Sequence, residues 1–136
     1  MVPGRELRLP ALFLAAAFAG HNFEEGLAYP AMRGDIAARV HELGLPWWSP
    51  QGAAFSAALL ALTLAASAAM LWAARSPPTR AKRTLIRALA WVMLANVLLP
   101  HVPAAFALRG YTPGLVTALA VNLPLSLWIL RTTRAG

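Results

Sequence analysis

A histidine and two glutamates stand close together inside an apolar stretch near the start of the chain. They are His21, Glu24 and Glu25, within the segment LPALFLAAAFAGHNFEEGLAY. Positions i, i+3 and i+4 lie on one face of a helix, so the three side chains can converge on one point. Ionisable groups in an apolar helix are costly and commonly mark function. Together they can bind a divalent cation or transfer protons.

Two later motifs carry further polar groups. His101 follows Asn96 in the stretch NVLLPH, with Pro100 directly before the histidine. Proline frees backbone carbonyls and bends a helix, so we expect a kink beside His101. The turn YTPGLVT then contains Tyr111 and Thr117.

The composition is that of a membrane protein. Of the 136 residues, 59% are hydrophobic and 12% are charged, and the mean hydropathy is +0.57. The net charge of +7 falls in short clusters between apolar runs, which favours contact with membrane lipids and argues against a nucleic-acid partner. Cysteine is absent, so neither a disulfide nor a thiolate metal ligand can form.

The apolar runs predict a single all-α domain over residues 1–136, an integral membrane bundle of four transmembrane helices. We expect spans at about 9–29, 51–74, 84–108 and 113–131, each close to the roughly 20 residues that cross a bilayer. A short interfacial helix is expected over about 35–43, between the first and second spans, with Asp35 at its start and Gly44 after its end. Its His41 and Glu42 are expected to be solvated. The N-terminal segment also resembles a cleavable signal peptide, but apolar residues resume after Glu25, which favours a retained span.

Basic residues are distributed unequally between the two sides that four spans create. Nine lie on the side of both termini and three on the other. By the positive-inside rule, we expect a multi-pass plasma-membrane protein with both termini in the cytoplasm. The nine are Arg5, Arg8, Arg75, Arg80, Lys82, Arg83, Arg87, Arg131 and Arg134, and the three are Arg33, Arg39 and Arg109.

Distance along each helix places several polar groups at matching depths. His21, His101 and Thr117 each lie 13 or 14 residues from a basic residue at the cytoplasmic end of their helix. At 1.5 Å per residue this is roughly 20 Å, so we expect the three to share one polar interior. Asn96 and Asn122 lie nine residues from such a basic residue and are expected in a second polar layer beneath.

The three motifs in this order resemble the HXXEE-motif family of small bacterial membrane proteins. The matching elements are the His-x-x-Glu-Glu of residues 21–25, the Asn and His of NVLLPH, and the Tyr-x-Pro-Gly-x-x-Thr turn of residues 111–117. The resemblance covers about residues 9–130 and implies a protein of the bacterial inner membrane with a shared polar site, without implying a reaction. It also implies a spacing of four between the Asn and the His, whereas Asn96 and His101 are five apart.

We predict a buried site whose catalytic groups and metal ligands are the same four residues, His21, Glu24, Glu25 and His101. Helical proteins hold iron, manganese or zinc with inward-facing Glu and His side chains. Four ligands favour one divalent ion with an open coordination position, acting on a small lipophilic substrate. Supporting roles beside the site are predicted for Asn96, Thr117 and Tyr111.

Three other functions stay open on the sequence. The same groups without a metal can move a proton on a lipid-like substrate, as an isomerase does. Glutamates in a helix can bind a cation in transit, which describes a carrier. Polar side chains can also serve only as hydrogen bonds between helices. A homo-oligomer is compatible with each function, and the sequence holds no nucleotide-binding loop or serine-nucleophile motif.

Overall fold

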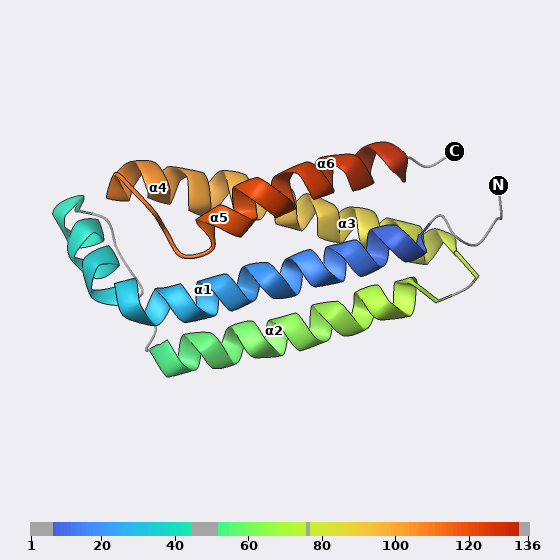
Figure 1. The fold of residues 1–136 in the computed structure, drawn as a ribbon, viewed down its shortest axis with the longest axis horizontal. Coiled ribbons are helices and arrows are strands. Elements are labelled where there is room, and N and C mark those ends of the chain that lie inside the picture. The colour runs from blue at the N-terminus through green and yellow to red at the C-terminus, as the bar shows by residue number, and fades with distance from the viewer. Residues whose placement is uncertain (1–6, 45–51, 76, 134–136) are drawn as a thin grey trace.

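The computed structural model describes residues 7–44, 52–75 and 77–133, and this part of the chain is built from helices. Two are uninterrupted α-helices, α1 (Arg8–Glu42) and α2 (Gly52–Ala73). A third segment joins α3 (Arg80–Asn96), the π-helix η1 (Val97–His101) and α4 (Val102–Leu108). A fourth joins α5 (Leu115–Thr117), the π-helix η2 (Ala118–Asn122) and α6 (Leu123–Thr132). Figure 1 shows these four long segments lying side by side.

The first helix is longer than the sequence predicted. It runs on through Pro30 to Glu42, so residues 35–42 continue α1 and do not form a separate short helix. Proline removes one helical hydrogen bond and crowds the carbonyl four residues before it, which kinks a helix without always ending it. Figure 1 shows the last part of α1 turning away from the direction of the rest. Gly44, with a φ of +65°, ends the helix as predicted.

Three helical segments are long and apolar enough to cross a membrane. They are Gly52–Ala73, Arg80–Leu108 and Leu115–Thr132, each within four residues of a predicted span at either end. The fourth long helix, α1, has sufficient length, but it is not among these three. The polar run from His21 to Glu25 lowers the hydropathy of its apolar half.

One end of the molecule collects most of the basic residues. There α1 begins, α2 passes to α3, and α6 ends (Figure 1). The amine of Lys82 donates to the carbonyls of Arg75 at 2.6 Å and Pro77 at 3.1 Å, which secures the connection from α2 to α3. Arg5 and Arg134, which belong to the predicted basic side, lie outside the described residues.

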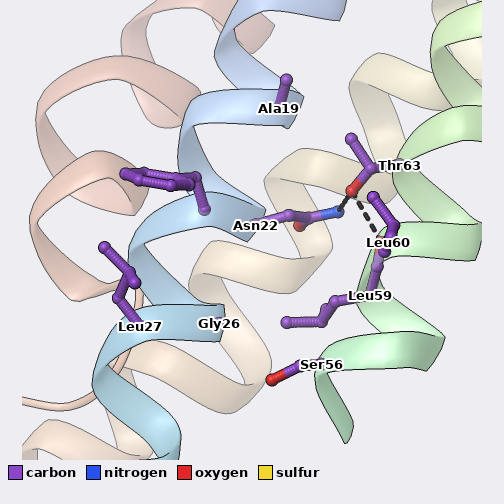
Figure 2. A pocket seen from close by; sticks show the side chains of 9 residues that line it. Ala19, Asn22, Gly26, Leu27, Ser56, Leu59, Leu60 and Thr63 are labelled. Carbon is purple, nitrogen blue, oxygen red and sulfur yellow. Dashed lines mark hydrogen bonds between the residues drawn. The ribbon is translucent and has the colours of Figure 1, made fainter. Parts of the chain in front are cut away.

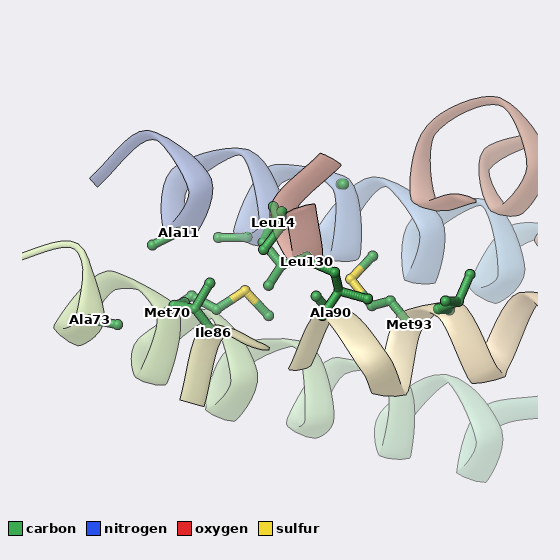
Figure 3. Packing of buried hydrophobic residues seen from close by; sticks show 12 residues of the cluster. Ala11, Leu14, Met70, Ala73, Ile86, Ala90, Met93 and Leu130 are labelled. Atoms are coloured by element: carbon green, nitrogen blue, oxygen red, sulfur yellow. The ribbon is translucent and has the colours of Figure 1, made fainter. Parts of the chain in front are cut away.

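An apolar core fills the half of the molecule next to this basic end. Side chains from α1, α2, α3 and α6 meet there, with Leu14, Met70, Ile86 and Ile129 fully buried (Figure 3). The core packs against one face of the first three turns of α1, which precede His21 in the chain. The polar residues of the site therefore lie next to a close-packed apolar core, and this core fixes the spacing of the helices around them.

A groove of about 400 Å³ lies between α1 and α2 (Figure 2). Asn22 crosses it and donates to Thr63 Oγ1 at 2.7 Å, while Thr63 donates to the Leu59 carbonyl. Asn22 thus joins α1 and α2. The residues that line this groove include no ionisable side chain.

Candidate metal centre

His101 lies on a π-helical turn that keeps it on the same face as Asn96. Residues five apart in an α-helix point about 140° away from each other. A π turn, with hydrogen bonds between residues five apart, brings them into line. Asn96 Nδ2 accordingly lies 3.0 Å from His101 Nε2. The π turn of η1 thus lets two residues that are five apart lie on one face of the helix. This turn also contains Pro100, which has no N–H to donate to a helical hydrogen bond.

The protonation of the His21 ring follows from its hydrogen bonds. Thr117 Oγ1 lies 3.0 Å from His21 Nδ1 and donates its own hydrogen to the Gly114 carbonyl at 3.3 Å. Because a hydroxyl has a single hydrogen, His21 Nδ1 must donate to Thr117. In a neutral imidazole the other nitrogen then carries a lone pair. Nε2 of His21 is therefore an acceptor or a metal ligand.

The His101 ring has the same tautomer for a different reason. Its backbone partner is Pro113, and a proline offers a carbonyl but no N–H. A ring N–H beside this residue can therefore donate only to the carbonyl. Since Nε2 is the nitrogen that faces the amide of Asn96, Nδ1 carries the hydrogen. His101 also presents the lone pair of Nε2.

The two lone pairs meet in the interior. The Nε2 atoms of His21 and His101 lie 3.2 Å apart, with the ring planes at 89°, and both side chains are buried. Two lone pairs at this distance repel unless hydrogens or a cation lie between them. Asn96 Nδ2 is 3.0 Å from both nitrogens, so its two hydrogens can satisfy both. The same pair of nitrogens is arranged to bind one cation.

Glu25 adds a carboxylate to this pair. Its Oε2 lies 3.9 Å from His21 Nε2, and one ligand atom from each of His21, Glu25 and His101 lies within 4.8 Å of the others. Glu25 borders two cavities, one of about 310 Å³ and one of about 150 Å³. It has no hydrogen-bond partner among the described residues, which leaves its oxygens available to an ion.

Glu24 faces a different set of partners. Its carboxylate accepts the Tyr111 hydroxyl at 2.7 Å and the backbone N–H groups of Val116 at 3.3 Å and Thr117 at 2.9 Å. A carboxylate at the N-terminus of a helix satisfies N–H groups that lack a helical partner. Burial and the hydrogen bond to Glu24 together raise the pKa of Tyr111 to about 12. Glu24 therefore fastens the start of the Leu115–Thr132 segment to α1.

Gly114 lies directly against the rings of His21 and His101. A Cβ atom at this position would lie 2.7 Å from His21 Cε1 and 2.9 Å from His101 Cε1. Its φ of +80° is also one that side-chain-bearing residues rarely adopt. The glycine thus lets the backbone of the 111–117 turn lie directly against both rings. The sequence predicted a turn and helix start here, but no signal in it indicated contact with the histidines.

The structure brings most of the predicted site together. Three of the four predicted ligands converge, and Glu24 is directed to the turn. Asn96 contacts both histidines, Thr117 contacts His21, and Tyr111 contacts Glu24. The expected sharing of one interior by His21, His101 and Thr117 is confirmed. The second polar layer is wrong for Asn96, because the π turn directs it to the histidines. Asn122 does not contact the histidines through a hydrogen bond; it is buried in the wall of the larger cavity beside Glu25 without a hydrogen-bond partner among the described residues.

These features define a class of protein, a helical chain with membrane-length apolar segments and a buried histidine–carboxylate group. The family described as "Protein of unknown function with HXXEE motif" matches residues 12–129. The chain belongs to this family, and His21, Glu24 and Glu25 are its eponymous motif. Searches of curated proteins and of solved structures found no match.

Proposed function

We propose that this protein is an integral membrane enzyme that holds one divalent metal ion at His21, Glu25 and His101 and acts on a lipid-like substrate. The observation that carries the proposal is the convergence of two imidazole lone pairs and one carboxylate in a buried position. Neutral imidazole and carboxylate together suit zinc, iron and manganese better than the all-oxygen sites of calcium.

The distances support a tetrahedral ion. Two nitrogens bound to zinc at 2.0 to 2.1 Å stand about 3.3 Å apart, close to the 3.2 Å between the Nε2 atoms. The ligand atoms of the three residues lie within 4.8 Å of one another and the Glu25 oxygen lies 3.9 Å from His21 Nε2, so the carboxylate has to move by about 0.5 to 1.5 Å to reach the same separation from both nitrogens. Three protein ligands leave a fourth position open, which is the arrangement of catalytic rather than structural zinc sites.

A metal ion in this position supplies Lewis acidity or a water of lowered pKa. The remaining residues of the site have supporting roles. Thr117 and the Pro113 carbonyl hold the Nδ1 hydrogens, which sets the orientation of both rings and leaves Nε2 free for the ion. Asn96 satisfies the Nε2 atoms when they are not coordinated.

The membrane setting is also part of the proposal. We infer that α1 crosses the bilayer beside the three apolar segments, because its polar face turns toward them and the groups on that face are satisfied there. The basic residues at the end where α1 begins and α6 ends support termini in the cytoplasm of a bacterial inner membrane. The site then lies within the bilayer, where a substrate dissolved in lipid can reach it.

A metal-free acid–base enzyme is the second candidate. The observation that favours it is the position of Asn96, whose amide hydrogens already satisfy both Nε2 atoms. Glu25 with His21 then forms an acid–base pair beside a largely apolar cavity. This candidate predicts no metal requirement, so metal content separates the two.

Elemental analysis of purified protein tests the proposal. Detergent-solubilised protein is washed with chelator, loaded with zinc, iron(II) or manganese, and freed of excess metal. We expect about one ion per chain in the wild type and loss of the ion in His21→Ala/Glu25→Ala. The matched control is His41→Ala/Glu42→Ala, the same pair of changes at two exposed positions, which should keep the ion. Folded wild type without metal, or equal metal in the site variant, contradicts the proposal.

A further inference from the structure

The larger of the two cavities beside Glu25 has one polar side and an otherwise apolar wall. Its volume is about 310 Å³, and His21, Glu25 and Asn96 lie along the polar side. The apolar wall comes mainly from α2 and α3, including Leu59, Leu89 and Met93. A site of this composition fits a ligand with an aliphatic body and a small polar group.

The cavity is reached from between α2 and α3. Leu62 on α2 and Val92 on α3 both line it and are 54% and 60% exposed, whereas Met70 and Met93 in its inner wall are 0% and 3% exposed. The exposed side chains therefore mark its mouth. Because α2 and the Arg80–Leu108 segment that begins with α3 are apolar and long enough to span a membrane, the mouth faces lipid when the chain is inserted.

Asn122 lies in the wall of the cavity and has a buried side-chain amide without a hydrogen-bond partner among the described residues. The side chain is 0% exposed, and neither its Nδ2 nor its Oδ1 has a hydrogen-bond partner among the described residues. Buried amides are almost always hydrogen-bonded, and leaving one unpaired is costly. Ser126, one turn further along, is equally buried and unpartnered but does not line the cavity. Asn122 is thus distinguished by its place in the wall.

We propose that this cavity binds a neutral alcohol with a single aliphatic chain, whose hydroxyl exchanges hydrogen bonds with the amide of Asn122. This names the substrate class of the site above and rests on the proposed function for its catalytic meaning. A hydroxyl both accepts and donates, so it can satisfy Nδ2 and Oδ1 together. An ammonium cannot accept, and a carboxylate cannot donate.

Charge and size support the same ligand. The residues that line the cavity include no lysine or arginine, and the one ionisable acid, Glu25, disfavours an anion. A volume of about 310 Å³ lies at the lower end of the usual range for small-molecule sites. One chain therefore fits, and a two-chain phospholipid does not.

Photolabelling tests the inference in metal-free protein reconstituted into phosphatidylcholine nanodiscs. The probe is a ten-carbon alcohol with a diazirine on its chain, and the competitors are 1-decanol, decane, decanoate and decylamine. We expect labelled peptides in α2 and α3 and competition by 1-decanol at about one tenth of the concentration needed for the others. Asn122→Leu should abolish this preference, while Ser126→Ala should keep it.

A second pair of variants tests the mouth and remains informative if Asn122→Leu does not fold. Val92→Trp adds bulk at the mouth, and Val116→Trp makes the same change at a position that is also 60% exposed but lies outside the cavity. We expect labelling to fall severalfold in the first variant and to stay at the wild-type level in the second. Equal labelling of both variants overturns the inference.

The remaining outcomes separate this inference from the metal site. If decane competes as well as 1-decanol, the probe only partitions into an apolar space and the inference is wrong. Metal content is measured on the same preparations. Stoichiometric metal without a preference for the alcohol removes the inference and leaves the metal site, whereas the preference without metal supports the acid–base candidate.

Discussion

The Nε2 atoms of His21 and His101 lie 3.2 Å apart although 80 residues separate them in the chain. Both accept from the amide of Asn96, so in the neutral rings the hydrogen is on Nδ1 and Nε2 carries a lone pair. The folded chain thus holds two ligand atoms at close to the separation that a tetrahedral ion requires. Because both Nε2 atoms already carry a lone pair, no proton has to move between the ring nitrogens when an ion binds.

Zinc is expected to stabilise the folded protein through these two rings. A ligand at 100 times its Kd adds about 2.7 kcal/mol to the free energy of unfolding. We therefore expect the Tm of chelator-washed wild type to rise by several degrees with zinc. His101→Ala should show no rise, and His41→Ala should respond as the wild type does. An equal rise in all three proteins would place the ion elsewhere.

Removing Asn96 should strengthen metal binding. Its amide hydrogens take up the two lone pairs that an ion needs, and each neutral hydrogen bond contributes roughly 1 kcal/mol. We expect Asn96→Ala to bind zinc about tenfold more tightly and to be about 1 to 2 kcal/mol less stable without metal. Competition against a chromophoric chelator measures the affinity. Weaker binding in the variant would mean that Asn96 is itself a ligand or orients the ligands.

The helices were largely predictable from the sequence, and so was the meeting of His21, His101 and Thr117. Apolar runs bounded by basic residues fix the spans, and residue counts from those ends fix the depth. The different roles of Glu24 and Glu25 were not predictable, because both lie on the same face of α1. Their separation depends on where the 111–117 turn presents its N–H groups, which is a tertiary relationship.

Where helices continue or change their hydrogen bonding was also not predictable from the sequence. The apolar run placed the end of the first helix near residue 29 and a separate helix over 35–43, yet α1 continues through Pro30 to Glu42. The spacing of Asn96 and His101 indicated a mismatch with the family pattern, and the π turn that resolves it is a change of backbone hydrogen bonding. Neither feature is encoded in hydrophobic periodicity.

Gly114→Ala should disrupt the site while Gly110→Ala should not. The added methyl group meets both histidine rings at under 3.0 Å, and alanine at a φ of +80° costs about 1 to 2 kcal/mol more than glycine. At Gly110 a Cβ atom meets nothing within 4 Å. We expect metal content to fall well below one ion per chain in the first variant and to stay at the wild-type level in the second. Full occupancy in Gly114→Ala would mean that the turn moves away from the rings freely.

The bond between Tyr111 and Glu24 should be visible in the ionisation of the phenol. The pKa of Tyr111 is raised to about 12, first by burial and then by its hydrogen bond to Glu24. Because the folded pKa lies above the unfolded value of about 10, the contribution to stability is complete below pH 10 and is lost as the pH rises through 12. We expect an absorbance titration of Tyr29→Phe, which leaves Tyr111 as the single tyrosine, to show a midpoint near 12.

Adding Glu24→Gln removes the carboxylate charge and should lower the midpoint toward 10, with burial alone keeping it above that value. A midpoint near 10 before this second change would show that the turn does not stay closed over α1, and with it that Gly114 does not stay against the histidines.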